Sequence, residues 1–365
     1  MHLTLIVGAR PNFVKAAALL APARRCGDVA VRLIHTGQHY DERLSGELFA
    51  DLGLPTPDVH LGVGPAPPAG QLGAMLLALD PVLAAERTDA VVVVGDVTST
   101  LAGALAAARS GIPVAHVEAG LRSGDRSMPE ELNRILTDHA ADFLFTSEPA
   151  ANENLRAEGI PPHRTWFVGN VMIDTFLRHR EVARRRPTLA RWGVSAGGYA
   201  LCTIHRPANV DTPDAAERTV RLVTGLAARL PTLFPIHPRT AARLEAFGGF
   251  PRLTAVASLQ VLPPLGYLDF LALLDGARLV VTDSGGIQEE TTALGIPCLT
   301  YRENTERPIT VTHGTNRVVG NDPEVALRRV EEVLAAPPAP LPPPPLWDGR
   351  AGERVILALR EQLRA

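Results

Sequence analysis

Short apolar runs recur along the chain, and most of them lack the alternation of polar and apolar residues that is typical of half-exposed strands. Such runs are characteristic of strands in a parallel sheet whose two faces are both covered by helices. The longer segments between them, such as Leu101–Arg109 and Asp214–Arg229, show helical periodicity. We therefore predict a doubly wound α/β fold. The predicted strands are Leu3–Val7, Val31–His35, Ala90–Val94, Val114–Val117, Phe143–Phe145, Trp166–Val168, Tyr199–Ile204, Leu233–Ile236, Leu259–Leu262, Leu279–Thr282 and Cys298–Tyr301.

The strands form two series, and a chain of 365 residues is long for a single core. We expect a first domain over residues 1–170 and a second over 171–345, with the division near the arginine-rich helix Arg178–Arg186. Residues 336–346 are rich in proline and predict a stiff connector, because proline fits neither a helix interior nor a central strand. The helix expected after it, at Ala351–Leu363, would then pack away from its sequence neighbours.

Composition limits the class of protein. A formal net charge of −3 gives no reason to expect a nucleic acid or an anionic membrane as partner. No apolar run is long enough to suggest a membrane span, and the apolar start ends at Gly8, too early for a secretory signal. Three widely spaced cysteines, Cys26, Cys202 and Cys298, indicate reduced thiols of a cytoplasmic protein. No Cys/His spacing predicts a metal site.

The chain has a single lysine, Lys15, although arginine is abundant. An ammonium group is a compact point charge, whereas the arginine fork is wide and planar. Lys15 follows the strand Leu3–Val7 and a glycine turn, which is where open α/β sheets place their ligand contacts. Chance survival of one lysine is an equal explanation from composition alone, and the position favours function.

The string from Thr282 to Glu290 joins a strand to a helix through Asp283, Ser284, Gly285 and Gly286. Glycines let a ligand approach the free amides at a helix N-terminus, where the helix dipole favours an anion. Glu290 could accept hydrogen bonds from a ribose diol. A capping box requires Glu or Gln three residues after the N-cap residue, but Ile287 stands three residues after Ser284 and Gly286 three after Asp283. Helix capping therefore does not explain the carboxylates of this string. We favour nucleotide diphosphate binding over a plain helix start.

Three acids are expected at the carboxyl edge of the first sheet. Asp96 follows the strand Ala90–Val94, Glu118 closes the strand at Val117, and Glu131 lies in the first turn of the next helix. Helix capping is an equal alternative for Asp96, and dipole stabilisation is one for Glu131 and its neighbour. Glu118 has no capping role. Acids grouped there would raise one another's pKa values, which suits proton transfer.

The second half places His205 and His237 just after predicted strands, where an imidazole could meet a diphosphate or move a proton. A lone histidine is more often structural, and two in this position make that explanation weaker. A charged loop containing Arg302, Glu306 and Arg307 follows the strand Cys298–Tyr301. It is either a solvated loop or a further ligand contact.

These residues lie within longer strings that extend from about Leu3 to Gly320. The strings are Gly8-Ala9-Arg10-Pro11 with Lys15, His35-Thr36-Gly37-Gln38-His39, Gly95-Asp96, His116-Val117-Glu118-Ala119-Gly120-Leu121-Arg122, Pro129-Glu130-Glu131-Leu132-Asn133-Arg134, Thr203-Ile204-His205-Arg206, Asp283-Ser284-Gly285-Gly286-Ile287-Gln288-Glu289-Glu290 and Thr305-Glu306-Arg307-Pro308. In content and order they resemble the bacterial non-hydrolysing UDP-N-acetylglucosamine 2-epimerases. The resemblance implies a GT-B-type fold, with two Rossmann-like domains, an inter-domain cleft and a C-terminal helix that returns to the first domain.

The resemblance also implies roles. Asp96, Glu118 and Glu131 match the catalytic acids of that family, and His205 matches its essential histidine. The other matching positions are Arg10 and Lys15 near UDP and the active site, Ser284, Gly285 and Gly286 in the phosphate cradle, Glu290 at the ribose, and His237 and Arg307 in the substrate site. In the family, UDP and the C2 proton leave together to give 2-acetamidoglucal, and both return with inversion at C2. The chemistry needs neither nicotinamide nor a metal cofactor. A homodimer formed through the first domain and a role in cell-envelope polysaccharide synthesis are also implied.

Two positions depart from the family pattern. Asn12 stands where many members have Glu, and Pro207-Ala208-Asn209 stands where many have Arg-Glu-Asn. These changes put activation by a second UDP-sugar near Gln38 in doubt and leave open a substrate in a uronic acid form. Three further alternatives remain: a GT-B glycosyltransferase, a hydrolysing epimerase and a non-catalytic nucleotide-sugar sensor.

Overall fold

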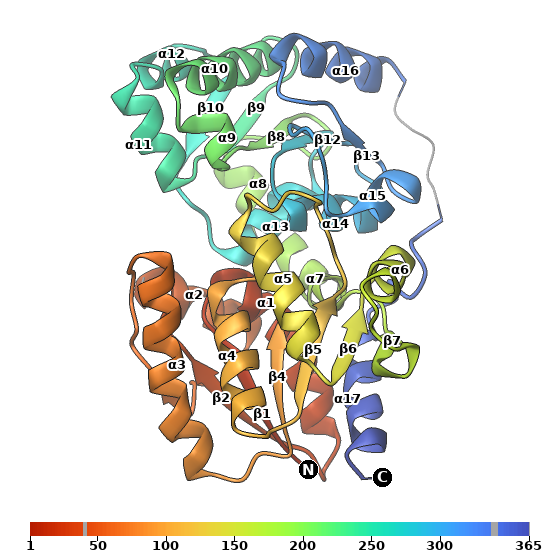
Figure 1. Ribbon diagram of the computed structural model, residues 1–365. Coiled ribbons are helices and arrows are strands. Elements are labelled where there is room, and N and C mark those ends of the chain that lie inside the picture. The colour runs from red at the N-terminus through yellow and green to blue at the C-terminus, as the bar shows by residue number, and fades with distance from the viewer. Residues whose placement is uncertain (39–41, 337–341, 365) are drawn as a thin grey trace. The chain divides into compact units, whose positions relative to one another are not determined.

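The computed structural model describes residues 1–38, 42–336 and 342–364, without the side chains of residues 42–45. It contains two compact units, one made of Met1–Arg178 with Pro345–Ala365 and the other of His179–Pro344. His39 and residues 337–341 of the expected proline connector lie outside the described residues. The α/β fold with two parallel sheets is confirmed, since each unit contains one (Figure 1).

The first unit is built on a seven-stranded parallel sheet in the order β3-β2-β1-β4-β5-β6-β7. Right-handed crossovers place α1 on one face and α3, α4 and α5 on the other (Figure 1). Most of the apolar runs are buried as expected, and all five residues of β4 are buried, whereas the residues of β7 are only partly buried. The elements are β1 His2–Val7, α1 Arg10–Arg25, β2 Ala30–His35, α2 Glu42–Leu52, β3 Val59–His60, α3 Pro68–Ala85, β4 Ala90–Val94, α4 Thr98–Arg109, β5 Val114–Ala119, α5 Pro129–Ala140, β6 Phe143–Thr146, α6 Pro149–Ala157, a 3₁₀ turn Pro162–Arg164, β7 Thr165–Phe167, α7 Val171–Arg184 and α17 Ala351–Gln362.

The second unit contains a six-stranded parallel sheet in the order β10-β9-β8-β11-β12-β13. Both sheets reverse their strand order beside their first strand, β1 or β8, and ligands of doubly wound folds bind beyond the carboxyl ends of the strands at such a point. The elements are α8 Thr188–Arg191, β8 Ala200–Thr203, α9 Pro207–Val210, α10 Pro213–Ala227, β9 Thr232–Pro235, α11 Pro238–Ala246, α12 Phe250–Thr254, β10 Leu259–Leu262, α13 Tyr267–Asp275, β11 Leu279–Thr282, α14 Gly285–Leu294, β12 Cys298–Thr300, α15 Pro308–Thr312, β13 Asn316–Val318 and α16 Pro323–Ala335.

The last helix, α17, belongs to the first unit and packs on α1. A Cβ atom at Gly352 would lie 2.1 Å from the carbonyl oxygen of Ala18, so the two helix backbones approach closely. Asp174 of α7 accepts hydrogen bonds from the amides of Ala351 and Gly352, at 3.1 and 2.7 Å. This carboxylate satisfies free amides at the start of α17 in the way an N-cap residue does.

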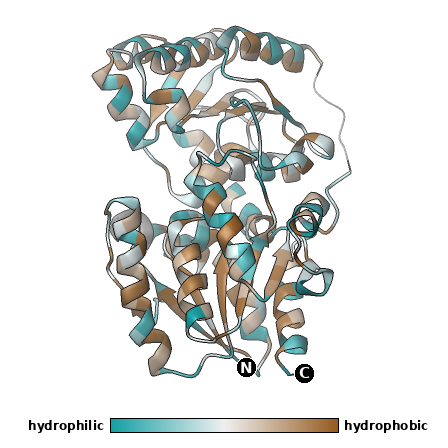
Figure 2. Ribbon diagram, in the orientation of Figure 1, coloured by the Kyte–Doolittle hydropathy of each residue, from teal (hydrophilic) through white to brown (hydrophobic). Residues whose placement is uncertain are grey.

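The apolar character of helix α3 was not anticipated from the sequence. Helix α3 has the length and composition of a membrane span, with a mean hydropathy of 1.3, so the expectation of no such run is wrong. Only 22% of this segment is buried, and Leu77 is 80% exposed. Figure 2 shows hydrophobic residues along α3 as well as along the strands. The inner face of α3 packs on α4, while its outer face presents apolar residues.

Candidate active site

Lys15 and Glu118 form a buried ion pair in the first unit. The Lys15 Nζ lies 2.7 Å from Oε1 of Glu118, and the two side chains are 5% and 2% exposed. Lys15 comes from the second turn of α1, and Glu118 from the carboxyl end of β5. A Cβ atom at Gly95 would lie 2.6 Å from the same Nζ. The structure therefore gathers the lysine, Glu118 and the end of β4 at one edge of the sheet.

Glu118 has a strained backbone. Its φ is +72°, in the left-handed region that non-glycine residues seldom adopt. Strand β5 continues to Ala119 rather than ending at Val117, and its register with β6 shifts between these two residues. Glu118 is thus the extra residue of a β-bulge, a device that redirects a side chain. Such a conformation costs about 1–3 kcal/mol and persists only where other contacts hold it.

Asp96 and Glu131 meet through an arginine. Arg134 contacts an oxygen of Asp96 through one nitrogen and Oε2 of Glu131, at 3.1 Å, through the other. The backbone carbonyl of Asp96 accepts a hydrogen bond from Asn133 at 2.8 Å. The residue that caps α4 is Val97, so the capping alternative for Asp96 is wrong. Helix α5 therefore brings the two acids together through one guanidinium.

Glu131 is a fully engaged carboxylate. It accepts hydrogen bonds from the amides of Ser123 and Gly124, at 2.8 and 2.9 Å, and from the Ser123 hydroxyl. Burial alone would raise the pKa of Glu131, but these bonds and the charge of Arg134 hold its pKa below the ordinary value. The expectation that the three acids raise one another's pKa values is therefore wrong for Glu131, because cations separate the carboxylates.

The turn before α1 is held by Asn12. Its Oδ1 accepts hydrogen bonds from the amides of Gly8 and Ala9, at 3.1 and 3.2 Å, and its Nδ2 donates to the carbonyl of Val94 at 2.9 Å. Arg10, the first residue of α1, follows this turn and is half-buried. The departure from the family pattern at Asn12 thus ties β1 to β4 and leaves Asn12 itself 1% exposed.

In the second unit, α14 begins directly after β11. Its N-cap residue is Ser284, whose side chain makes no capping bond. A Cβ atom at Gly285 would lie 2.7 Å from Oε1 of Glu306 and 4.0 Å from the guanidinium of Arg307. The amides at this helix start, including that of Gly286, thus lie beside a charged loop. A helix N-terminus next to arginines suits an anionic ligand.

Asp283 holds His205. The Nδ1 of His205 lies 2.8 Å from Oδ1 of Asp283, and the backbone amides of His205 and Arg206 donate to the same carboxylate at 2.9 and 2.8 Å. Burial alone would raise the pKa of Asp283, but the bonds from these groups and Asn209 hold it below the ordinary value. A carboxylate at Nδ1 orients an imidazole and directs its Nε2 outward. The His205 side chain is 38% exposed.

His237 lies beside His205, with ring centroids 5.5 Å apart. It caps α11, and its Nδ1 accepts a hydrogen bond from the amide of Arg239 at 3.1 Å. The structure therefore brings together the two histidines that follow β8 and β9.

Buried charges surround the start of α14. Arg302, Glu306 and Arg307 are at most 6% exposed, so the alternative of a solvated loop is wrong for them. Arg307 pairs with Glu289 at 2.7 Å, and Arg302 with Glu306 at 2.8 Å. Two arginines and two glutamates thus form buried ion pairs beside the helix start.

Glu290 is a further buried carboxyl group of α14, with 6% of the residue exposed. Burial and the adjacent carboxylate of Glu289 raise the pKa of Glu290 to about 8, so the group is mostly protonated at neutral pH. The buried hydroxyl of Tyr267 makes no hydrogen bond within the part of the chain that the structure describes. Buried polar atoms of this kind are costly unless a ligand or water satisfies them.

Several residues that shape these sites had no predicted role. Arg134 and Asp283 stand inside the quoted strings, as do His116 and Arg122, while Asp138 stands outside them. The spacing of Glu131 and Arg134, three residues apart on a helix, could have indicated their ion pair. Asp283 and Asp138 contact residues that are far away in the sequence, and no local sequence pattern predicts such contacts.

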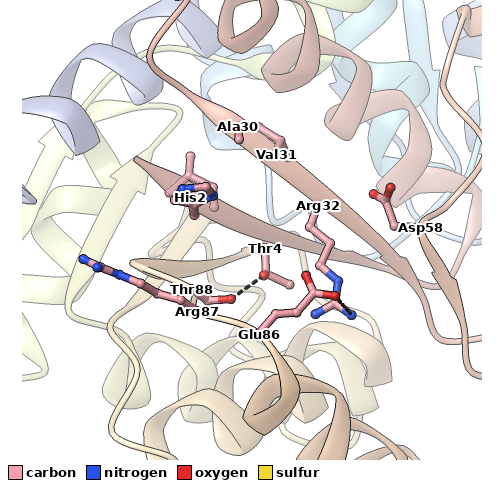
Figure 3. Close-up of a pocket in the computed structure, with 10 residues that line it drawn as sticks. His2, Thr4, Ala30, Val31, Arg32, Asp58, Glu86, Arg87 and Thr88 are labelled. Atoms are coloured by element: carbon pink, nitrogen blue, oxygen red, sulfur yellow. Dashed lines mark hydrogen bonds and ion pairs between the residues drawn. The ribbon is translucent and has the colours of Figure 1, made fainter.

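A cavity of about 270 Å³ lies elsewhere in the first unit, where β1 and β2 begin (Figure 3). Four of its polar groups form two pairs: Thr4 bonds Thr88 at 2.8 Å, and Arg32 pairs with Glu86 at 3.3 Å. It contains no predicted site residue. Across residues 1–38, 42–336 and 342–364, no group of three or more His, Cys, Asp or Glu residues is placed to hold a metal ion.

A family model of UDP-N-acetylglucosamine 2-epimerases matches residues 23–360. The chain belongs to this family. A relative from Methanocaldococcus jannaschii, named UDP-N-acetylglucosamine 2-epimerase, is 39% identical over 367 residues, which cover 98% of this chain and 99% of the relative. The crystal structure of the 2-epimerase from that organism with UDP-GlcNAc and UDP has a TM-score of 0.91 and 40% identity, and covers 99% of this chain and 100% of its own.

Another member of the 2-epimerase family has the same percentage identity over a smaller share of the chain. The UDP-2,3-diacetamido-2,3-dideoxy-D-glucuronate 2-epimerase of Pseudomonas aeruginosa is 39% identical over 323 residues, which cover 88% of each chain. The resemblance to the family and its GT-B-type fold is therefore confirmed, and identity alone does not separate these two substrates.

Proposed function

We propose that the protein interconverts UDP-N-acetylglucosamine and UDP-N-acetylmannosamine by elimination and re-addition of UDP. The observation that carries this proposal is Glu118, a buried carboxylate held by Lys15 in a strained bulge at a strand end. In this proposal Glu118, on β5, and Asp96, just after the paired strand β4, supply the acids that proton transfer at C2 requires.

In this proposal the start of α14 holds the diphosphate, through the amides of Gly285 and Gly286 and the Ser284 hydroxyl. His205, oriented by Asp283, supplies a hydrogen-bond donor to the leaving group, and Arg307 supplies positive charge. Glu290 and the free hydroxyl of Tyr267 offer polar contacts to the nucleoside. Arg10 in the first unit and His237 in the second are further candidate contacts to the substrate.

The C2 proton of a 2-acetamido sugar is weakly acidic, so departure of the diphosphate leads and leaves positive charge on the ring. The carboxylates of Asp96 and Glu118 stabilise that charge and take the proton. Glu131 is held by the Ser123–Gly124 turn and by Arg134, so its contribution is to keep the turn and the arginine in place. A site that excludes water would protect the glucal intermediate.

Incubation with UDP-N-acetylglucosamine in deuterated water tests the proposal. Deuterium should appear at C2 of both epimers, because each passage through the glucal returns a solvent proton. Free UDP with no second epimer would indicate a hydrolysing enzyme or a glycosyltransferase. If no UDP-acetamido sugar gained deuterium at C2, the result would contradict the proposal.

A second candidate substrate is a UDP-diacetamido uronic acid, because the Pseudomonas relative named for that substrate has the same percentage identity as the archaeal relative, over 88% of this chain. A carboxylate at C6 needs a cationic partner, which UDP-N-acetylglucosamine does not. The ratio of kcat/KM for the two substrates decides between them.

The exposed apolar face of α3 supports a homodimer formed through the first unit. Leu77→Glu should convert a dimer to a monomer in light scattering, without unfolding, since the side chain is 80% exposed. A wild-type monomer would contradict the dimer. Nucleotide-sugar chemistry also fits a cytoplasmic location, which cell fractionation would test.

A further inference from the structure

A buried pair lies beneath Glu118 and takes no part in the chemistry described above. His116 of β5 and Asp138 of α5 are both 0% exposed, and Nδ1 of His116 lies 2.6 Å from Oδ1 of Asp138. The other ring nitrogen, Nε2, lies 2.8 Å from the carbonyl oxygen of Gly95. This one imidazole therefore joins the ends of β4 and β5 to α5.

Each ring nitrogen of His116 has a defined hydrogen-bond partner. A carbonyl oxygen only accepts hydrogen bonds, so Nε2 carries a proton. The second oxygen of Asp138 accepts from the amide of Gly120 at 3.0 Å and contacts Arg122 at 2.8 Å, as expected of a carboxylate. Burial alone would raise the pKa of Asp138, but His116 and Arg122 hold it below the ordinary value. Both ring nitrogens of His116 therefore take part in the tie, one to the carboxylate of Asp138 and one to the backbone of Gly95.

The geometry explains how the strain at Glu118 is held. His116 precedes Glu118 by two residues and Gly120 follows it by two, and both bind the same carboxylate of Asp138. The Asp138 side chain thus binds residues on both sides of the β-bulge. Through Gly95 the same pair also fixes the backbone directly before Asp96.

We propose that His116 and Asp138 are positioning residues that hold Asp96 and Glu118 in their working geometry. The proposal rests on the function proposed above. Both side chains are fully buried, so neither touches substrate, and they act through the segments that they tie. Displacement of a reacting group by about 1 Å can cost roughly 100-fold in rate, and loss of this tie should have an effect of that size.

The variants His116→Gln and Asp138→Asn test the proposal by steady-state kinetics and UDP titration. Each should lower kcat about 100-fold, with KM and the Kd for UDP within about threefold of wild type, because the tie orients reacting groups rather than binding groups. The double variant should regain at least about tenfold over Asp138→Asn. In it the introduced glutamine can donate to Gly95 and accept from the introduced asparagine, and no buried charge is left alone.

The control is Leu155→Ala, which opens a cavity at a buried residue of α6 in the same unit without touching the pair. It should lower Tm with kcat within about threefold of wild type. Single variants with wild-type kcat, or a loss of kcat shared by the control, would overturn the proposal.

The ¹⁵N spectrum of the wild-type His116 ring tests the tie without activity. Ring signals that show hydrogen bonds at both nitrogens support the tie, and a ring without them overturns it even if the single variants do not fold. If the wild-type protein shows no turnover on any UDP-sugar, the proposed function fails, while this spectrum still decides the state of the pair.

Discussion

Lys15 occupies a space that an arginine cannot enter. Its Nζ lies 2.7 Å from Glu118 and against the backbone of Gly95. Lys15→Arg should therefore lower kcat by about 100-fold, because the wider guanidinium displaces the carboxylate from its place. Lys15→Met should lower the free energy of unfolding by about 3–5 kcal/mol, because it leaves a buried carboxylate without its cation. Turnover assays and thermal unfolding check the two variants.

The matched control for Lys15→Arg is Arg24→Lys, the reverse exchange at an exposed position of the same helix. It should leave both kcat and Tm unchanged, since surface charges contribute little. Wild-type turnover in Lys15→Arg would show that any cation serves, and would remove the reason for retaining the single lysine.

Glu290 should make stability depend on pH. Its pKa is raised from 4.5 to about 8, so the folded protein keeps a proton that the unfolded chain has lost. The stability from this group is complete below about pH 4.5 and is lost as pH rises to about 8, at up to about 1.4 kcal/mol per pH unit. Glu290→Gln lacks this ionisation. The Tm of the variant minus that of wild type should thus increase from pH 5 to pH 8, and a constant difference would contradict the protonated carboxyl.

Site residues that lie within the quoted sequence strings were easier to predict than the partner residues that orient them. Lys15 stood out by composition, and Glu118 by its place after an apolar strand. The partners Asp138 and Asp283 act through contacts with residues 22 and 78 positions away in the sequence. Such contacts exist only after the sheet has formed, because the register of β4, β5 and α5 decides which side chains meet.

At the scale of elements, the continuous apolar strands were predicted well, including the edge strands β7 and β10, whereas the edge strands β3 and β13 were missed. β4 and β11 match their predicted bounds, because their residues are buried on both faces. β3 has two residues and β13 three, too few for a period to be detected. The bulge in β5 was also missed, since its conformation depends on contacts outside the strand.

The packing of α17 on α1 leaves no room for a side chain at Gly352. Gly352→Ala should lower the free energy of unfolding by about 1–3 kcal/mol, because its Cβ atom would meet the carbonyl of Ala18 at 2.1 Å. Gly46→Ala, in α2, is the control, since a Cβ atom there meets nothing within 4 Å. Because alanine favours helix, that variant should gain up to about 1 kcal/mol. Chemical denaturation measures both, and equal effects would contradict the close approach.

For the whole molecule, the predicted residues divide between the two units. The acids, Arg10 and Lys15 belong to the first unit, and His205, His237, Arg307, Glu290 and the start of α14 belong to the second. If the second unit holds the nucleotide and the first moves the proton, binding and turnover must respond to different substitutions. This separation is the strongest test of the proposed function, because a shared fold alone does not require it.

Asp96→Asn and Gly285→Ala form the decisive pair. Asp96→Asn should lower turnover by about 10³-fold while the Kd for UDP stays within threefold, because it removes a carboxylate charge and leaves the second unit unchanged. Gly285→Ala should weaken UDP binding at least about tenfold, because its Cβ atom would lie 2.7 Å from Glu306 and displace it from its pairs with Arg302 and Arg206. Calorimetry with UDP and deuterium incorporation at C2 measure the two effects. If both variants weakened UDP binding equally, the acids of the first unit would be binding groups, and the assignment of proton transfer to them would be wrong.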